Sequence, residues 1–370
     1  MKNVLTFAHQ KLICAKMREE NIGSFIELVE NAIKKYWDKD ALTDYEGATL
    51  QYKDVARKIE KLHIIFKEAG ISEGDKIAVC GRNSSQWAAA FLSILTYGAV
   101  AVPILHEFTP EQIYNIIEHS ESKLFFVGDQ VWPDLDADKM PRLQGIFGLH
   151  DFSLMVSRSG MITNARERLN ELFGKKYPKN FRKEHVAYRR DEHEELAMIN
   201  YTSGTTSQSK GVMIPYRAVW SNMDFASGAL GVSIHEGSRV VSILPMAHMY
   251  GMAFEFLYEF ISGAHVFFLT KNPSPTIIFK AFSRIKPDLI VSVPLILEKA
   301  LRRAVLPKLQ TPKMKLLMRM PYVKDKVVTA IGNQLTEAFG GKFYEVIIGG
   351  AALNRDIEEF LHRIHFRFTV

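Results

Sequence analysis

The chain has 370 residues, of which 47% are hydrophobic and 24% are charged. This balance is typical of a globular protein and excludes a disordered or fibrous one. The net charge of +6 suits a protein that handles phosphates or lies near anionic lipid, and we expect no nucleic-acid partner. Cys14 and Cys80 form no CxxC pair, so a disulfide framework and a Cys-based zinc site are excluded. Residues 1–20 lack an apolar secretory core, and we expect a cytoplasmic protein.

Short apolar runs alternate with helical patterns along the chain, and helices are expected at Tyr52–Glu68 and Glu111–His119, among others. Strands that alternate with helices indicate βαβ units. The predicted fold class is therefore α/β with mostly parallel sheets. The candidate strands are Lys76–Cys80, Lys123–Val127, Leu196–Asn200, Arg239–Ile243, His265–Leu269, Leu289–Val293 and Tyr344–Ile348.

The uncharged stretch Trp87–Leu105 allows two interpretations. Its length is compatible with a membrane-spanning helix. However, Gly98 and Pro103 divide it. We therefore favour a buried helix that ends at Gly98, followed by a buried parallel strand that ends at Pro103.

The expected internal boundary lies in residues 158–195, which begin basic, finish acidic and have little apolar periodicity. We interpret them as a solvated helical surface between two αβ subdomains, at 1–190 and 191–370. The last residues, His365–Val370, have the pattern of a strand with no turn signal or polar tail. Because chain ends usually fray rather than stop within a sheet, we expect an incomplete portion of a longer protein, with the second subdomain truncated.

The segment with the clearest chemical signal is Tyr201–Val212, YTSGTTSQSKGV, which directly follows a candidate strand. Its small residues let backbone N–H groups approach anionic oxygens, its hydroxyls add donors, and Lys210 supplies a positive charge. The order of residues differs from that of the common P-loop, because Gly211 follows the lysine instead of preceding it. The segment predicts a phosphate-binding loop.

This loop resembles the signature of the adenylate-forming superfamily, which includes acyl-CoA synthetases, firefly luciferase and peptide-synthetase adenylation domains. Ser207 and Ser209 stand where glycine and proline are usual. Other segments resemble the superfamily in the expected order and extend the resemblance over nearly the whole chain. They are Asp75–Ile104, Leu244–Gly251 (LPMAHMYG), Val293–Pro294 and Gly349–Leu353 (GGAAL).

The resemblance implies the large N-terminal domain of the adenylate-forming fold and a two-step reaction. A carboxylate attacks ATP to give acyl-AMP and pyrophosphate, and coenzyme A then accepts the acyl group. ATP, Mg²⁺ and coenzyme A are the implied cofactors and co-substrates. The glutamate that binds magnesium, and the small C-terminal domain with its catalytic lysine, are expected beyond Val370. By resemblance, this chain does not catalyse alone.

The resemblance also assigns roles to individual residues of this chain. The catalytic candidates are Thr205, Lys210 and His248, and His248 is placed beside the acid pocket, with a packing or capping role as its alternative. The phosphate and pyrophosphate candidates are Tyr201, Thr202, Ser203, Gly204, Thr205, Thr206 and Lys210. The candidates for the adenine and acyl-adenylate wall are Gly349, Gly350, Ala351 and Ala352. His106 and His265 are interpreted as structural.

The identity of the acid rests on weaker signals. The apolar run Tyr250–Phe268 would suit a fatty chain, although a core helix followed by a core strand explains most of it. The segment His106–Val127 resembles long-chain acyl-CoA synthetases, so a long-chain fatty acid is expected, with medium-chain and aryl acids as alternatives. A basic zone, Lys299–Lys326, predicts either peripheral contact with an anionic membrane at its inner face or a solvated helix pair.

Two further functions stay open at this stage. One is an adenylation module that loads a carrier protein instead of coenzyme A. The other is a non-catalytic nucleotide-binding or regulatory relative, which the departures at Ser207 and Ser209 support.

Overall fold

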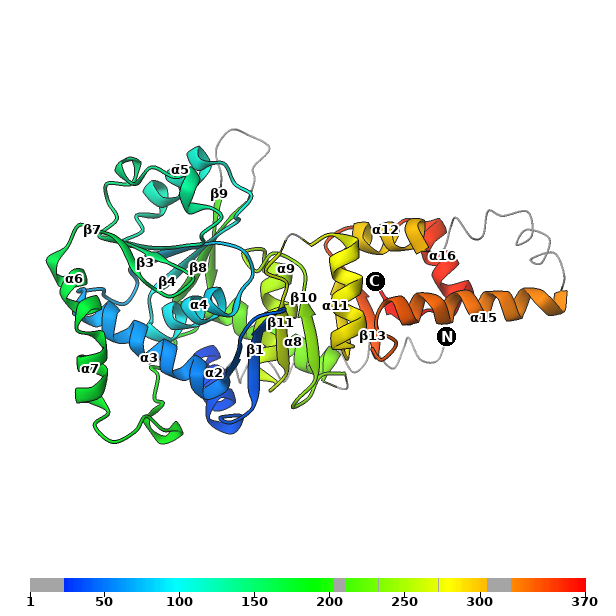
Figure 1. The fold of residues 1–370 in the computed structure, drawn as a ribbon, viewed down its shortest axis with the longest axis horizontal. Coiled ribbons are helices and arrows are strands. Elements are labelled where there is room, and N and C mark those ends of the chain that lie inside the picture. The colour runs from blue at the N-terminus through cyan, green and yellow to red at the C-terminus, as the bar shows by residue number, and fades with distance from the viewer. Residues whose placement is uncertain (1–22, 203–209, 232, 272, 305–320) are drawn as a thin grey trace.

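The computed structural model describes residues 23–202, 210–231, 233–271, 273–304 and 321–370. Two mostly parallel sheets lie side by side, and helices cover their faces (Figure 1). The predicted α/β class with two packed αβ units is confirmed.

Sheet B contains the strands of the first half of the chain and the candidate phosphate hairpin. Its order is β7-β6-β5-β3-β4-β8-β9, and the edge strands β7 and β9 run antiparallel to their neighbours. The strands are β3 (Lys76–Cys80), β4 (Val100–Ile104), β5 (Leu124–Val127), β6 (Gly145–Gly148), β7 (Leu154–Ser157), β8 (Leu196–Thr202) and β9 (Lys210–Pro215).

Sheet A contains an N-terminal hairpin and the strands of the second half. Its order is β14-β13-β12-β10-β11-β1-β2, and β2 at one edge is antiparallel. The strands are β1 (Asp40–Asp44), β2 (Thr49–Gln51), β10 (Arg239–Ser242), β11 (His265–Phe268), β12 (Leu289–Ser292), β13 (Glu345–Ile348) and β14 (Phe368–Thr369). The predicted strand at the chain end is thus present as β14.

The helices alternate with these strands, as the sequence pattern predicts. They are α2 (Phe25–Lys35), α3 (Tyr52–Glu68), α4 (Ser85–Tyr97), α5 (Pro110–Ser120), α6 (Gly160–Glu167), α7 (Leu169–Lys176), α8 (Tyr216–Leu230), α9 (Met249–Met252), α10 (Tyr258–Ile261), α11 (Pro275–Ile285), α12 (Pro294–Ala304), α15 (Pro321–Ala338) and α16 (Arg355–Arg363). Three short 3₁₀ turns, η1 (Trp132–Asp134), η2 (Ala137–Lys139) and η3 (Lys183–His185), and one π-helical turn, η4 (Ala253–Leu257), complete the elements.

The stretch Trp87–Leu105 forms a buried helix and a buried strand. Ser84 caps α4 by accepting a hydrogen bond from the Trp87 amide at 3.1 Å, and Gly98 ends the helix in the left-handed conformation with φ of 88°. Glycine adopts this conformation without a Cβ penalty. The strand β4 continues one residue past Pro103 and lies between β3 and β8. Among the described residues, no helix has the length and apolarity needed to span a membrane.

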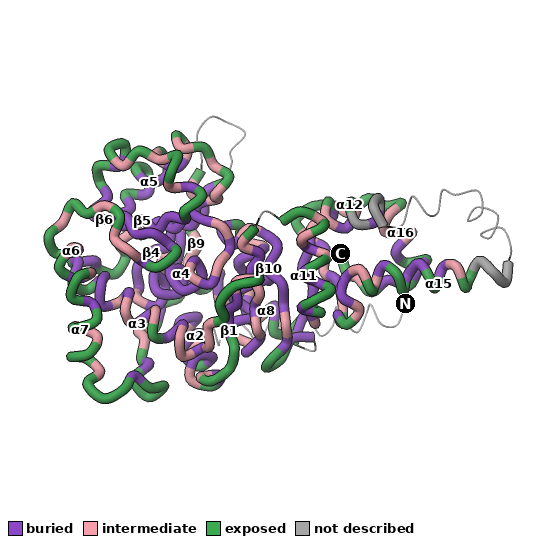
Figure 2. The backbone as a smooth tube through the Cα atoms, viewed as in Figure 1, coloured by how far each residue is buried: buried purple, intermediate pink, exposed green. Residues whose placement is uncertain are grey.

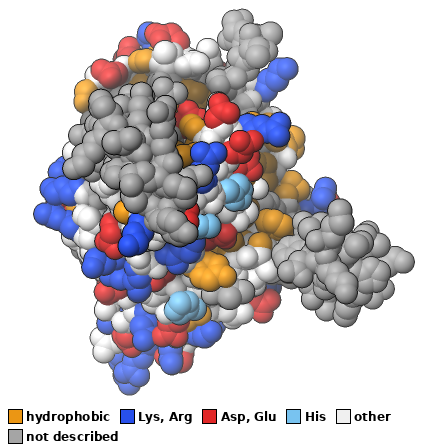
Figure 3. Space-filling model, turned by 90° about the vertical axis from the view of Figure 1, so that its right-hand side faces the viewer, with side chains coloured by type: hydrophobic (Ala, Val, Ile, Leu, Met, Phe, Trp, Pro, Cys, Tyr) orange, Lys and Arg blue, Asp and Glu red, His pale blue; other side chains and the backbone are white. Residues whose placement is uncertain are grey.

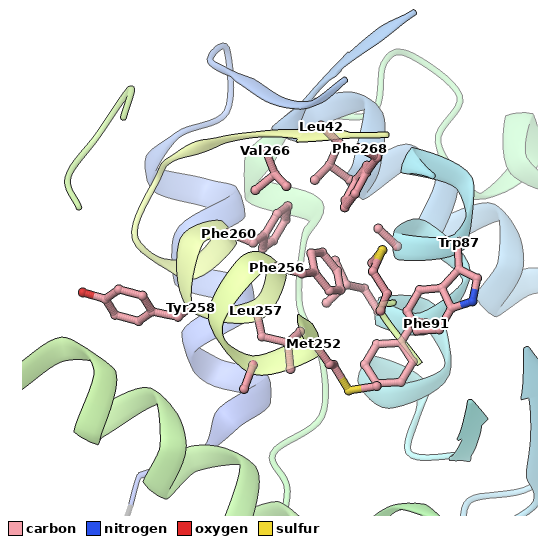
Figure 4. Close-up of a cluster of buried hydrophobic side chains, with 14 of the residues drawn as sticks. Leu42, Trp87, Phe91, Met252, Phe256, Leu257, Tyr258, Phe260, Val266 and Phe268 are labelled. Carbon is pink, nitrogen blue, oxygen red and sulfur yellow. The ribbon is translucent and has the colours of Figure 1, made fainter. Parts of the chain in front are cut away.

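The main core fills the space between the helices and the two sheets, where buried residues concentrate (Figure 2). Much of the apolar run Tyr250–Phe268 contributes to it. Phe256, Phe260 and Phe268 are fully buried. The ring of Phe256 contacts those of Phe260 and Phe268 and reaches Phe91 on α4 (Figure 4). Most of the run is therefore core, which is the alternative to an acyl pocket that the sequence allowed.

Sheet membership crosses the expected boundary between residues 190 and 191. The hairpin β1–β2 joins sheet A through β11, whereas β8 and β9 join sheet B through β4. The pairing of strands depends on which faces they bury and on their register, and it need not follow their order in the sequence. The boundary predicted from charge composition therefore does not separate the two sheets.

The charged segment 158–195 is a largely exposed surface with helices α6 and α7, as expected. Its acidic end also has a structural role. The carboxylate of Asp191 accepts hydrogen bonds from the amides of Phe25 at 3.1 Å and Ile26 at 2.8 Å. These amides at the start of α2 have no partner within the helix, so Asp191 stabilises its N-terminus.

Candidate functional site

The candidate phosphate loop connects the antiparallel strands β8 and β9. Thr202, the last residue of β8, pairs with Lys210, the first residue of β9. Both residues are exposed, and Lys210 has no ion-pair partner in the described part of the chain. Ser203, Gly204, Thr205 and Thr206 lie outside the described residues. Thr202 and Lys210, which flank the loop, thus lie exposed on the strand pair at the edge of sheet B.

Tyr201 differs from Thr202 and Lys210 because its side chain is buried in the protein. It is 4% exposed, and its hydroxyl lies 2.7 Å from Nδ1 of His119 on α5. Burial raises the pKa of the Tyr201 phenol. Its side chain therefore holds the end of β8 against α5, and a direct role in phosphate binding stays a prediction.

The segment Leu244–Gly251 bridges the two sheets. From the end of β3, the Asn83 amide donates to the Leu244 carbonyl at 2.6 Å and accepts from the Met246 amide at 2.9 Å. From β8, the Asn200 amide donates to the Ala247 carbonyl at 2.8 Å. Both asparagines are buried, so these bonds are shielded from water and fix the segment beside the strand that leads into the phosphate loop.

A buried carboxyl group fixes the start of the same segment. Oε2 of Glu255, in the π-helical turn, accepts from the amides of Ile243 at 2.9 Å and Leu244 at 2.8 Å. Gly251 allows this close packing, because a Cβ at that position would lie 2.7 Å from the Pro245 carbonyl oxygen. The sequence analysis missed Asn83, Asn200 and Glu255. The signal in the sequence that could have revealed these three residues is that each is polar and stands beside or within an apolar run.

The predicted segments Leu244–Gly251 and Gly349–Leu353 meet at Tyr250. Its ring lies against Gly349, where a Cβ would come within 2.6 Å of the Tyr250 hydroxyl. This hydroxyl is buried and has no hydrogen-bond partner in the described part of the chain. Burial raises the pKa of Tyr250 to about 12, so the phenol is neutral and can donate to a ligand. Tyr250 was not predicted as a site residue.

The other candidates have simpler environments. His248 is exposed and caps α9, since its Nδ1 accepts from the Tyr250 amide at 3.3 Å. Gly350 adopts φ of 79°, and Ala351 and Ala352 are exposed beside it. His265 contacts the Thr43 hydroxyl at 2.6 Å, and His106 pairs with Glu107 at 3.3 Å. The contacts of His265 and His106 fit the structural roles predicted for them.

Glu255 and Glu259 form a pair of fully buried carboxyl groups one turn apart. Both oxygens of Glu259 and Oε1 of Glu255 lack hydrogen-bond partners among the described residues. Burial raises the pKa of both groups well above the usual range, and their proximity raises the pKa of Glu255 further. Both carboxyls therefore keep their protons to a higher pH in the folded protein than in the unfolded chain.

This pair predicts that the folded protein loses stability as the pH rises. Above about pH 4.5 the unfolded chain releases protons that the folded chain keeps, so stability falls until the folded carboxyls ionise. We expect Glu259→Gln to remove one carboxyl's part of this slope, up to about 1.4 kcal/mol per pH unit, between pH 5 and 7. Urea unfolding across this range measures the slope, and Glu167→Gln on the exposed end of α6 is the control. Equal slopes for both variants would contradict the prediction.

A profile of AMP-binding enzymes matches residues 29–369. The match covers most of the chain, so the chain belongs to the AMP-binding enzyme family. The predicted membership of the chain in the adenylate-forming superfamily is thereby confirmed.

Several similar curated proteins are named as long-chain-fatty-acid–CoA ligases. The long-chain-fatty-acid–CoA ligase FadD15 of Mycobacterium bovis is 27% identical over 287 residues, which cover 77% of this chain and 45% of that protein. The long-chain-fatty-acid–CoA ligase heimdall of Drosophila melanogaster is 23% identical over 291 residues, which cover 75% and 42%. The chain therefore spans about half the length of the curated relatives it matches.

Solved structures share the fold. The anthranilate CoA ligase AuaEII in complex with anthranoyl-AMP superimposes with a TM-score of 0.71 at 15% identity, over 94% of this chain and 59% of that one. The N-terminal domain of FACL13 from Mycobacterium tuberculosis gives a TM-score of 0.67 at 18% identity, over 94% and 74%. At these identities the likeness shows the fold alone. The predicted large N-terminal domain of the adenylate-forming fold is confirmed.

Proposed function

We propose that this chain belongs to an acid–thiol ligase that activates a long-chain fatty acid with ATP and transfers the acyl group to coenzyme A. The observation that carries the proposal is the β8–β9 phosphate hairpin in a chain of the AMP-binding enzyme family. The reaction follows from its chemistry. A carboxylate is a poor acyl donor because it has a poor leaving group. In the mixed anhydride with AMP, the acyl group is attached to AMP, which is a good leaving group.

The hairpin would neutralise charge in the first step. Lys210 and the hydroxyls and amides of residues 202–206 would contact the β- and γ-phosphates and the departing pyrophosphate. Phosphoryl transfer depends mainly on positioning and charge stabilisation, so an exposed and unpaired lysine at the base of this loop suits the role.

The Tyr250–Gly349 contact would form the wall on which the acyl-adenylate lies. The Tyr250 ring fills the space beside Gly349, and Gly350 next to it lacks a Cβ, so a flat ligand ring could approach the backbone there closely. The unpartnered Tyr250 hydroxyl offers a donor at this wall, and a buried donor without a partner favours a ligand that supplies an acceptor. His248 begins the same helix and would lie beside the acid.

Magnesium is commonly held by one or two carboxylates together with substrate phosphates. The described residues contain no group of three or more His, Cys, Asp or Glu side chains that could bind a metal ion.

The proposed acid and acceptor rest on the relatives. Several have names that specify long-chain fatty acids and coenzyme A. An acyl-carrier-protein ligase of Arabidopsis thaliana, AEE15, is 25% identical over 300 residues, which cover 77% of this chain and 40% of that protein. Transfer to a carrier protein is therefore the second candidate for the acceptor.

Peripheral contact with the inner face of a membrane stays part of the proposal for a cytoplasmic protein. The basic zone expected to make it, Lys299–Lys326, lies mostly outside the described residues. Figure 3 views the end of the molecule that carries α15 and α16, where positive and negative side chains are interspersed among the residues shown.

Acid-dependent exchange between ATP and pyrophosphate tests the proposal in the full-length protein. We expect exchange with long-chain fatty acids, weaker exchange with medium-chain and aryl acids, and at least a tenfold loss in Lys210→Gln. The matched control is Lys139→Gln, which changes an exposed lysine beside Tyr114 of α5. ATP binding without exchange for any acid would overturn the proposal and favour a regulatory relative. Transfer to coenzyme A or to a carrier protein then identifies the acceptor.

A further inference from the structure

Two basic segments that are far apart in the sequence meet at a pocket on the surface. One is the end of α2 with the residues that follow it, Lys34–Lys39, and the other is the turn Arg182–Glu184. Together they line a cavity of about 350 Å³. The sequence predicts a solvated surface for the basic run in residues 158–195, and the fold places Lys34–Lys39 beside it.

The lining of this pocket carries an excess of unpaired positive charge. Lys34 and Lys39 form ion pairs with Glu30 at 2.6 Å and Glu236 at 2.9 Å. Lys35, Arg182 and Lys183 have no carboxylate within ion-pair distance in the described part of the chain. Of the two acidic residues in the lining, Asp38 is paired with Lys53 at 3.0 Å. Among the described residues of the lining, Glu184 is therefore the carboxylate left to oppose Lys35, Arg182 and Lys183, and Lys35 also lies over the Tyr36 ring at 4.9 Å.

The backbone on both sides of the pocket is fixed. The Trp37 carbonyl accepts from the Lys53 amide at 3.0 Å, and the Lys39 carbonyl accepts from the Tyr52 amide at 3.0 Å. Across the pocket, the Arg182 amide donates to Nδ1 of His185 at 2.9 Å. The Trp37 ring lies 5.8 Å from that of Phe181, between ring centres. A pocket with fixed walls binds a ligand with little ordering cost.

An ordinary structural role explains part of this charge. Lys34 and Lys35 lie in the last turn of α2, where cations interact favourably with the helix dipole. That role does not apply to Arg182 and Lys183, which precede and begin a single 3₁₀ turn. Binding of an anionic ligand would therefore account for the presence of Arg182 and Lys183 in this lining.

We propose that this pocket binds a phosphoryl group, either of an anionic phospholipid headgroup or of a soluble phosphate ester. Guanidinium and ammonium groups are the usual protein ligands of phosphate oxygens. The cavity is larger than one phosphate, which suits a phosphoryl group that carries a polar substituent. The Trp37 side chain would contact that substituent.

The pocket is distinct from the candidate active site. It lies at the amino end of β1, which begins at Asp40, whereas the segment Leu244–Gly251 follows the carboxyl end of the parallel strand β10. Strands of four or five residues are about 13–17 Å long, so the two sites lie at opposite ends of sheet A. Binding at this pocket does not depend on the proposed acid activation.

Lysine acetylation read by mass spectrometry tests the site directly. We expect pyrophosphate, or vesicles of phosphatidylcholine with phosphatidic acid, to reduce labelling of Lys35 and Lys183 at least threefold. Labelling of Lys139 and Lys286 in the same molecules should stay unchanged. Protection by the vesicles alone assigns a lipid headgroup, and protection by pyrophosphate as well assigns a phosphoryl group from either source. Pure phosphatidylcholine vesicles should not protect. The proposal would be overturned if neither pyrophosphate nor the phosphatidic acid vesicles changed the labelling of Lys35 and Lys183.

A pair of double variants with the same change in charge provides the second readout. Arg182→Gln/Lys183→Gln is expected to weaken the protecting ligand's binding by about tenfold or more, since each cation near an anionic surface contributes several-fold. Lys139→Gln/Lys286→Gln is expected to leave binding unchanged. Equal weakening in both would show a general charge effect and contradict a site at this pocket. Circular dichroism and thermal unfolding establish that both variants are folded.

Discussion

Gly349→Ala is expected to displace the Tyr250 ring and to abolish most of the proposed adenylation. The added Cβ would lie 2.6 Å from the Tyr250 hydroxyl oxygen and 2.7 Å from the ring carbon that bears it. These distances are far inside van der Waals contact, and the ring is held at the start of α9. Overpacking of this kind costs about 1–3 kcal/mol in the free energy of unfolding. The loss of exchange between ATP and pyrophosphate should exceed the loss expected from stability alone.

A double-mutant cycle with Tyr250→Ala isolates the contact. In Gly349→Ala/Tyr250→Ala the clash is removed, so the two changes should be less destabilising together than the sum of the single variants, by about 1 kcal/mol or more. Gly174→Ala, at a helical glycine with nothing within 4 Å of its added Cβ, should be neutral or stabilising by about 0.5–1 kcal/mol. Additive effects at Gly349 and Tyr250 would show that the two residues do not touch in solution.

Glu255→Ala is expected to destabilise the protein by about 3–4 kcal/mol and to loosen the segment Leu244–Gly251. The substitution leaves the buried amides of Ile243 and Leu244 without their acceptor. Each unsatisfied amide costs about 1–3 kcal/mol, and the cavity left by the side chain adds to this. Urea unfolding measures the global effect. Hydrogen exchange at the amides of Ile243 and Leu244 measures the local one.

Glu255→Gln is the matched control, because its amide oxygen can accept the same two bonds. Burial raises the pKa of Glu255, which favours its neutral form, so this change should alter the free energy of unfolding at pH 5 by less than about 1 kcal/mol. If the alanine and glutamine variants were equally unstable, the two hydrogen bonds to Glu255 would not be what holds the segment.

Much of the local structure could be predicted from the sequence. Helix α3 has the predicted bounds, and the predicted strand at Lys76–Cys80 is β3. The helix, glycine stop and strand in Trp87–Leu105 follow from residue type alone, because Gly98 and the apolar runs act within a few residues of themselves. The phosphate hairpin was recognisable for the same reason: Tyr201–Val212 is a contiguous segment.

The candidate site beyond the hairpin was predictable only in part. The GGAAL and LPMAHMYG segments were recognised by resemblance, but nothing local shows that Tyr250 rests on Gly349. Glu255 stands in an apolar run that predicts core packing, and its two backbone partners precede it by more than two helical turns. Asn83, in the connection after β3, and Asn200, on β8, bind the same segment from distant parts of the chain.

By itself, the sequence determined the α/β class, most of the elements and the candidate phosphate-binding segment, because these depend on periodicity and on residues within one short window. The tertiary structure alone decided that β1 and β2 join the second sheet and that β8 and β9 join the first. It also decided that Tyr250 meets Gly349 and that Lys35 shares a pocket with Arg182. Such contacts depend on strand register and on packing between distant segments, which no local pattern of residues specifies.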